Sequence, residues 1–364
     1  MSRSIRSIIS VTLLFVFAFS VAIFFATGGL AGSGNQLAQN FLARSDVKGL
    51  PDQDKKPPTV AILLFDRAEI IDFAGPWEVF GGAGFQVFTV AEKRDPVNAV
   101  YGQKLTADYT FENSPPADVL LVPGGGVGDA MNNPKLIKWV QDRAKESTYV
   151  MSVCTGAAIL AKAGLLNGLT ATTVRGGIDR LPTMGTNIKT VYDKRYVDNG
   201  KIITTAGLSS GIDGALYLVS KMLGKGIAQE LALNIEYKWD PDGRFVRAAY
   251  ADRYLPYFQR MKTLDETALS VDGDTERWDW KMLVTKPGSV KEIIELVQNE
   301  IVSNTPHKKS AVAITPRGVT SADRSEIEWK FTDDEGRAWK GSGLAESTPT
   351  AKGINLTIRL ERAK

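Results

Sequence analysis

The chain has 364 residues, enough for about two domains and a leader. Its 44 basic and 41 acidic residues leave a net charge of +3, and this balance argues against nucleic acid or an anionic membrane surface as a partner. With one cysteine and one histidine, the sequence holds no Cys/His cluster for zinc, and we expect neither a metal nor another cofactor.

Residues 1–31 have the pattern of an export leader. A short basic segment at residues 2–6 precedes an uncharged apolar run at residues 8–26, and small residues follow. A cleaved signal peptide and an uncleaved signal anchor both fit this pattern. Either one predicts an extracytoplasmic location, with membrane contact through this segment only. The polar residues 32–58 predict a linker.

From residue 59 onward, strand-like apolar runs alternate with helical segments. Strands are predicted over residues 60–65, 85–90, 119–123, 149–153 and 202–205, and helices over residues 77–80, 136–145, 156–162 and 212–223. This alternation predicts an α/β domain over residues 59–262, with a doubly wound, mostly parallel sheet. In such a sheet, ligands bind beyond the carboxyl ends of the strands.

A second pattern begins after about residue 262 and predicts a small α+β domain of unknown role over residues 270–364. Residues 278–284, 326–331 and 354–360 alternate with period two, and residues 290–303 are amphipathic. The domain holds four of the seven tryptophans, Trp278, Trp280, Trp329 and Trp339. We interpret them as the core of a small sheet rather than as an exposed surface for a glycan or a partner.

Cys154 is the strongest candidate for a reactive residue. It lies between an apolar strand and the helix predicted at residues 156–162. A strand-turn-helix junction of this kind presents a nucleophile, and the free N–H groups of the helix favour a thiolate. A buried, inert cysteine is the alternative. A Cys–His pair within this domain is excluded, because the sole histidine, His307, lies in a distant polar turn, where we expect a solvated side chain.

A set of ordered segments carries a resemblance to a known family. They read DFAGPWEVF at residues 72–80, VPGG at 122–125, VCTG at 153–156, LAKAGLLNGLTATT at 160–173 and TAGLSSGID at 205–213. Together they resemble the PfpI-like branch of the class I glutamine amidotransferase-like superfamily, near isonitrile hydratases and the amidase-like domains of AraC-type regulators. The resemblance covers roughly residues 58–250. It implies a flavodoxin-like fold and a homodimer.

The resemblance also implies roles for particular residues. Cys154 matches the nucleophile, Asp72 the acid beside its sulfur, and the N–H groups of Gly125 and Thr155 the donors that stabilise a charged intermediate. Asp72 has an alternative role as the cap of a helix that begins near residue 76. Glu78 is a weaker alternative for the acid.

Further residues are candidates for substrate binding. Three consecutive glycines, Gly124, Gly125 and Gly126, predict a tight turn that a small ligand approaches, because no Gly-Lys-Ser/Thr follows to make a phosphate loop. Ser209, Ser210 and Asp213 line a pocket, start a helix, or do both. Arg175 binds an anionic substrate or forms a surface ion pair.

Val174 is a departure from the family pattern, since many members have histidine after the paired threonines. This weighs against protease, glyoxalase and deglycase-like activities and leaves the isonitrile hydratase interpretation intact. The C-terminal domain does not look like a helix-turn-helix pair. We therefore expect an exported, cysteine-dependent hydratase acting on a small-molecule substrate. The alternatives are an extracytoplasmic ligand-binding or redox-sensing module with an oxidisable cysteine, and a scaffold that has lost activity.

Overall fold

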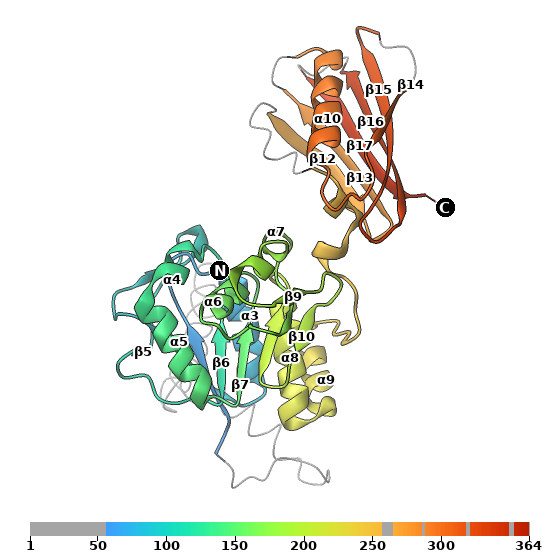
Figure 1. Cartoon of the computed structure of the whole chain (residues 1–364). Helices are drawn as coiled ribbons and strands as arrows, with labels where there is room; N and C mark the ends of the chain where they lie inside the picture. The colour runs from blue at the N-terminus through green and yellow to red at the C-terminus, as the bar shows by residue number, and fades with distance from the viewer. Residues whose placement is uncertain (1–55, 257–264, 286–287, 318–320, 349–352, 364) are drawn as a thin grey trace, which may run out of the picture.

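The computed structural model describes residues 56–256, 265–285, 288–317, 321–348 and 353–363 (Figure 1). The predicted leader, residues 1–31, lies outside the described residues, as does the predicted linker up to residue 55. Within the described ranges, no helix combines the length and the apolar character that crossing a membrane requires.

The first unit is built on a seven-stranded sheet in the order β10-β11-β7-β6-β1-β2-β5, which is parallel except for β10. Its strands are β1 (Thr59–Leu63), β2 (Gln86–Ala91), β5 (Tyr109–Thr110), β6 (Val119–Val122), β7 (Tyr149–Ser152), β10 (Tyr196–Asp198) and β11 (Ile202–Thr205). The central strands are buried along their length, which explains their unbroken apolar runs. The predicted doubly wound, mostly parallel sheet is confirmed.

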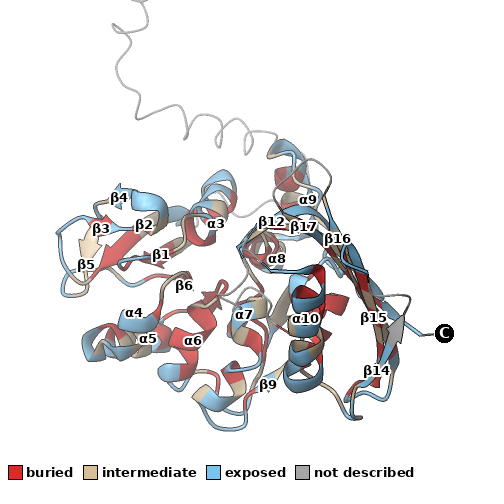
Figure 2. Cartoon of the chain, turned by 90° about the horizontal axis from the view of Figure 1, so that it is seen from above, coloured by how far each residue is buried: buried red, intermediate tan, exposed pale blue. Residues whose placement is uncertain are grey.

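Two groups of helices cover this sheet on opposite faces (Figures 1 and 2). One group is α4 (Gly128–Asn132), α5 (Pro134–Glu146) and α6 (Gly156–Lys162), and the other is α3 (Ile70–Gly82), α8 (Ser210–Leu223) and α9 (Lys225–Asn234). Shorter elements lie at the rim: β3 (Val97–Asn98), β4 (Lys104–Leu105), β8 (Thr170–Ala171), α7 (Arg175–Ile178) and β9 (Lys189–Thr190). The carboxyl ends of β1, β6, β7 and β11 are left open to form a site.

Helix α3 begins earlier than the sequence predicted. It starts at Ile70 and contains Pro76 in its interior, so Asp72 lies in its first turn and does not cap a helix that starts at Pro76. The proline costs one intrahelical hydrogen bond. Close packing between α3 and α8 compensates: a Cβ on Gly75 would lie 2.9 Å from Ile212, and one on Gly211 would lie 3.4 Å from Pro76.

The second unit is a six-stranded antiparallel sheet in the order β12-β13-β17-β16-β15-β14, with one helix against it (Figure 1). Its elements are β12 (Glu266–Gly273), β13 (Arg277–Val284), α10 (Val290–Asn304), β14 (Ala313–Arg317), β15 (Arg324–Thr332), β16 (Ala338–Ser347) and β17 (Ile354–Arg362). Helix α10 packs on β14, β15 and β16. It begins at a capping box between Ser289 and Glu292, the arrangement that satisfies the first free N–H groups of a helix.

The tryptophans of this unit lie in two different environments. Trp329 and Trp339 are fully buried, and the Trp329 indole lies over Gly341, where a Cβ would be only 2.1 Å from the ring. Trp278 is also buried, as expected of a core residue. Trp280 is only partly buried, and it lines a cavity together with Trp278. Trp280 still packs against the core of this unit, so the core interpretation holds for it in part.

The core of the second unit begins before the predicted boundary at residue 262. Ala251, Tyr254 and Leu255 belong to this core, and the Tyr254 ring lies 4.7 Å from that of Trp339. Ala251 and Tyr254 lie in a short 3₁₀ segment, Ala251–Tyr254, and Leu255 is the residue that follows it. A segment of this length is too short to show a periodic pattern in the sequence.

His307 lies at the contact between the two units and is not the solvated loop residue that we expected. Its side chain is 18% exposed, with Nε2 3.3 Å from Asp179 Oδ1 and Nδ1 3.4 Å from Asp334 Oδ2. Asp179 follows α7 in the first unit, and its carboxylate also accepts a hydrogen bond from the Tyr192 hydroxyl at 2.6 Å. The single histidine thus joins carboxylates from both units.

We expect this contact to weaken as the pH rises. The hydrogen bond to Asp179 is the main cause that raises the pKa of His307 above 6.5, and Asp334 adds to it against burial and the Arg253 charge. Protonated His307 therefore stabilises the folded chain below about pH 6.5, and this contribution is lost as the pH rises through the raised pKa. In urea titrations, His307→Gln should cost about 1 kcal/mol near pH 5.5 and almost nothing near pH 8.5.

Lys309→Gln is the matched control for this effect, because it removes a nearby exposed charge that takes no part in the contact between His307, Asp179 and Asp334. Its effect should be the same at both pH values. A cost of His307→Gln that does not change with pH would mean that the imidazole acts by shape alone.

Candidate active site

Cys154 lies in the turn between β7 and α6, and its backbone is held in an unusual conformation. Its φ is +56°, a region that non-glycine residues rarely occupy and that strained functional turns use. The Cys154 N–H donates to the carbonyl of Ala206 at 2.9 Å, and its carbonyl accepts from the Thr173 hydroxyl at 2.5 Å. Contacts from two other segments therefore hold the turn that positions the sulfur.

Two backbone N–H groups interact with the Cys154 sulfur and act to lower its pKa: those of Thr155 and Leu208. Leu208 lies in the loop after β11 and also has a positive φ, +52°. Sequence reasoning included Thr155 but missed Leu208, because a leucine that contributes only its backbone leaves no signal in the residue type. Its place at the carboxyl end of a strand was the one available indication.

Asp72 reaches the same site from the first turn of α3. Its side chain is fully buried, and Oδ2 accepts the N–H of Gly124 at 3.0 Å. Oδ1 has no hydrogen-bond partner among the described residues. Burial raises the pKa of Asp72 to about 7, and the Glu69 charge adds to this, whereas Gly124 and the Cys154 thiol oppose it. The carboxyl group therefore holds or releases a proton near neutral pH.

The Cys154 thiol is less acidic than the strand-turn-helix pattern predicted. Burial, followed by the negative charge of Asp72, raises its pKa to about 12 and outweighs the N–H groups of Thr155 and Leu208. The side chain is only 7% exposed. The resting pair is a neutral thiol beside a carboxyl group, and the two titrate as one coupled system.

The three glycines after β6, residues 124–126, pack against neighbouring segments and do not form an open loop around a ligand. The N–H of Gly125 donates to Thr155 Oγ1 at 2.8 Å, and the Thr155 hydroxyl donates back to the Gly125 carbonyl at 2.9 Å. Gly125 N–H is thus already bonded, contrary to its expected role as a donor to substrate. Gly124 lies against Asp72 and Thr155, and the N–H of Gly126 donates to the carbonyl of Arg67.

The candidates near the start of α8 belong to a buried ion-pair network. Ser209 occupies the N-cap position without a side-chain cap bond, and its hydroxyl accepts from Arg195 Nη2 at 3.1 Å. Arg195 also pairs with Asp213 at 2.5 Å, and the Tyr237 hydroxyl donates to that carboxylate. Ser210 is buried. Sequence reasoning missed Arg195, which organises this network.

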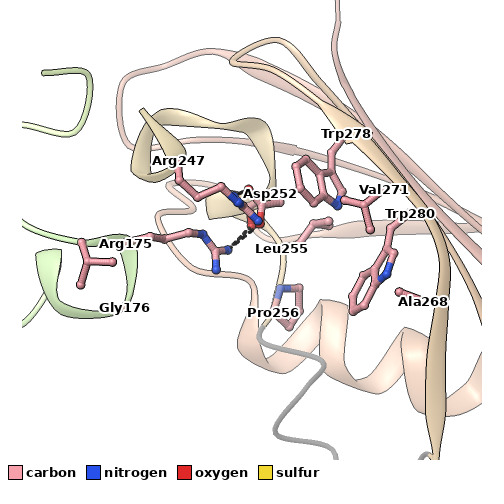
Figure 3. A pocket seen from close by; sticks show the side chains of 11 residues that line it. Arg175, Gly176, Arg247, Asp252, Leu255, Pro256, Ala268, Val271, Trp278 and Trp280 are labelled. Atoms are coloured by element: carbon pink, nitrogen blue, oxygen red, sulfur yellow. Dashed lines mark hydrogen bonds and ion pairs between the residues drawn. The ribbon is translucent and has the colours of Figure 1, made fainter. Parts of the chain in front are cut away.

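Glu78, Arg175 and Val174 make other contacts. Glu78 is exposed on α3 and is therefore not the buried acid. Arg175 opens α7, where its Nη2 lies 2.9 Å from Asp252 Oδ2. Val174 packs against Gly207, since a Cβ there would lie 2.8 Å from Val174 Cγ2. Arg175 and Val174 line a cavity between the two units, and Cys154 is not among its lining residues (Figure 3).

Comparison with known proteins matches residues 58–221 to the DJ-1/PfpI family. Isonitrile hydratase of Pseudomonas putida is 37% identical over 180 residues, which cover 49% of this chain and 78% of that protein. A deglycase of Pyrococcus abyssi is 27% identical over 161 residues, covering 43% and 92%. The crystal structure of a ThiJ/PfpI family protein from Pseudomonas syringae shares 31% identity, with a TM-score of 0.48 and coverage of 55% and 85%.

Proposed function

Because the chain belongs to the DJ-1/PfpI family, we propose that it is a cysteine-dependent hydratase that adds water to a small isonitrile-type electrophile. The observation that carries the proposal is the buried pair of Cys154 and Asp72, which works without a histidine. The sole histidine, His307, is engaged with Asp179 and Asp334. Similarity to the isonitrile hydratase of Pseudomonas putida supports the substrate class.

The pair supplies the proton transfers that hydration requires. Ionised Asp72 accepts the thiol proton as the Cys154 sulfur bonds to the terminal carbon of the isonitrile, and Asp72 then delivers that proton to the same carbon. The product of this step is a thioimidate. Water then adds to its carbon, one water proton goes to nitrogen, and the carbon–sulfur bond breaks. The other water proton restores the thiol through Asp72, and an N-substituted formamide leaves.

The raised pKa values suit these transfers. A carboxyl group with a pKa of about 7 exchanges protons with little cost near neutral pH. The N–H groups of Thr155 and Leu208, which interact with the sulfur, stabilise negative charge as the thiol proton leaves.

The redox-sensing alternative is disfavoured by the same features. Oxidation to sulfenic acid needs an accessible thiolate, whereas Cys154 is buried and its thiol pKa is raised. We retain the extracytoplasmic location as part of the proposal, on the basis of the leader at residues 1–31. A homodimer is likewise proposed from family resemblance alone.

Turnover of cyclohexyl isocyanide to N-cyclohexylformamide, followed by proton NMR, tests this function. We expect wild-type protein to form the formamide, Cys154→Ala to lose about a thousandfold or more, and Asp72→Asn to lose about a hundredfold. Glu78→Gln is the matched control, because it neutralises an exposed carboxylate on the same helix, and it should retain full activity. Wild-type turnover that survives Cys154→Ala would refute the proposal, as would activity on a glycated amine in place of the isonitrile.

A further inference from the structure

A cavity of about 360 Å³ lies where the two units meet, within the range of small-molecule sites (Figure 3). Three parts of the chain line it: the start of α7, the connector at residues 247–256, which holds the 3₁₀ segments Arg247–Ala249 and Ala251–Tyr254, and the β12–β13 hairpin. The residues that matter here are Val174, Arg175, Arg247, Asp252, Trp278 and Trp280. Cys154 does not line the cavity, so a ligand here is distinct from the electrophile proposed above.

One end of the cavity carries an excess of positive charge. Asp252 is buried and pairs with the guanidinium groups of Arg175 and Arg247. Arg175 Nη2 lies 2.9 Å from Oδ2 and donates to the backbone carbonyl of Asp252 at 3.0 Å, and Arg247 Nη2 donates to Oδ2 at 2.6 Å. Arg247 Nη1 pairs with Oδ1. Both carboxylate oxygens are therefore occupied, and among the described residues that line the cavity two guanidinium groups face this one carboxylate. This end attracts an anion and disfavours a cation.

The other end is aromatic and apolar. Trp278 and Trp280 lie two residues apart on the same face of β13, and Figure 3 shows their rings beside Leu255 and Pro256. The Arg247 guanidinium lies 4.5 Å from the centre of the Trp278 ring, so the charged and aromatic ends are continuous. A flat apolar group fits this wall better than a fully hydrated ion.

We propose that this cavity binds a small organic monoanion with a flat apolar body, of the aryl carboxylate class. The carboxylate lies toward Arg247 and Arg175, and the ring lies against Trp278 and Trp280. Because both units and their connector contribute to the walls, the ligand also holds the two units together.

Isothermal titration of the full chain with 2-naphthoate tests the site, with neutral 2-naphthamide as the paired probe. We expect naphthoate to bind about tenfold or more tightly than naphthamide, and Arg247→Ala to weaken naphthoate by a similar factor. Arg244→Ala is the matched control, since it removes an exposed arginine three residues away that does not line the cavity. Trp280→Leu should also weaken binding and provides a second test if Arg247→Ala fails to fold.

Several results would overturn the proposal. One is that naphthoate does not bind, and another is that naphthoate and naphthamide bind with equal affinity. A third is that Arg247→Ala and Trp280→Leu, both folded, bind naphthoate as tightly as the wild type. Inorganic phosphate that binds as tightly as naphthoate would reduce the cavity to a simple anion site and refute the aromatic part. Cys154→Ala should bind naphthoate normally, so failure of the hydratase proposal leaves this test intact.

Discussion

Asp72→Asn is expected to make the protein more stable while it removes activity. Burial raises the pKa of Asp72 from 3.8 to about 7, so ionisation of this group in the folded state carries a cost. The cost is absent below about pH 4, grows as the pH rises, and is complete above about pH 7. Asparagine avoids it and still accepts the Gly124 N–H through its carbonyl oxygen. The free energy of unfolding should rise by up to about 4 kcal/mol at pH 8, and by little at pH 4.

Denaturant titrations from about pH 4 to pH 8 measure this difference directly. Glu78→Gln serves again as the control, because an exposed carboxylate on the same helix should change stability by no more than about 0.5 kcal/mol at any pH. A gain that is independent of pH would show that asparagine packs better than aspartate and that the carboxyl pKa is ordinary. A loss of both stability and turnover would point to a structural role for Asp72.

Gly156→Ala is expected to damage the fold and the site together. Gly156 is the first residue of α6, and a Cβ there would lie 2.2 Å from the carbonyl oxygen of Val122 and 2.9 Å from that of Pro123. Backbone atoms at the end of β6 cannot move aside as a flexible side chain would. We expect a cost of about 3 kcal/mol, which exceeds the helix-propensity gain of about 1 kcal/mol from alanine. Any shift that relieves the clash moves Cys154, two residues earlier, so turnover should fall as well.

Gly128→Ala is the control for this prediction. Gly128 is likewise the first residue of a helix, α4, and a Cβ there meets nothing within 4 Å. Alanine should leave stability unchanged or increase it by up to about 1 kcal/mol, with turnover unchanged. Equal effects of the two substitutions in thermal and chemical unfolding would mean that the approach of α6 to β6 is not under steric constraint.

The architecture of the first unit was predictable because its buried strands are continuous apolar runs. The strand at Val119–Val122 and the helix at Gly156–Lys162 were both located from residue type alone. Helix α3 was placed too late, because Pro76 indicates a helix start when only local preferences count. Its true start depends on packing against α8, which joins residues more than a hundred positions apart.

The sequence predicted which residues form the site, but it did not predict their pKa values. The motifs brought Cys154 and Asp72 together, yet the pKa values depend on burial, which the local sequence does not record. The sequence also did not predict that the Leu208 N–H interacts with the sulfur, or that the Gly125 N–H is bonded to Thr155. Both depend on the path of the backbone, which residue type alone does not determine. His307 was misplaced for a related reason, since its partner Asp179 lies in the other unit.

The position of the single imidazole between Asp179 and Asp334 has a practical consequence for studies in solution. One histidine gives one pair of ring proton resonances, free of overlap from other imidazoles. Their chemical shifts change with contact to the Tyr192 and Tyr254 rings, whose centres lie 5.8 and 6.2 Å away. A single peak therefore reports whether the two units are docked or apart, and exchange broadening of that peak measures how fast they separate.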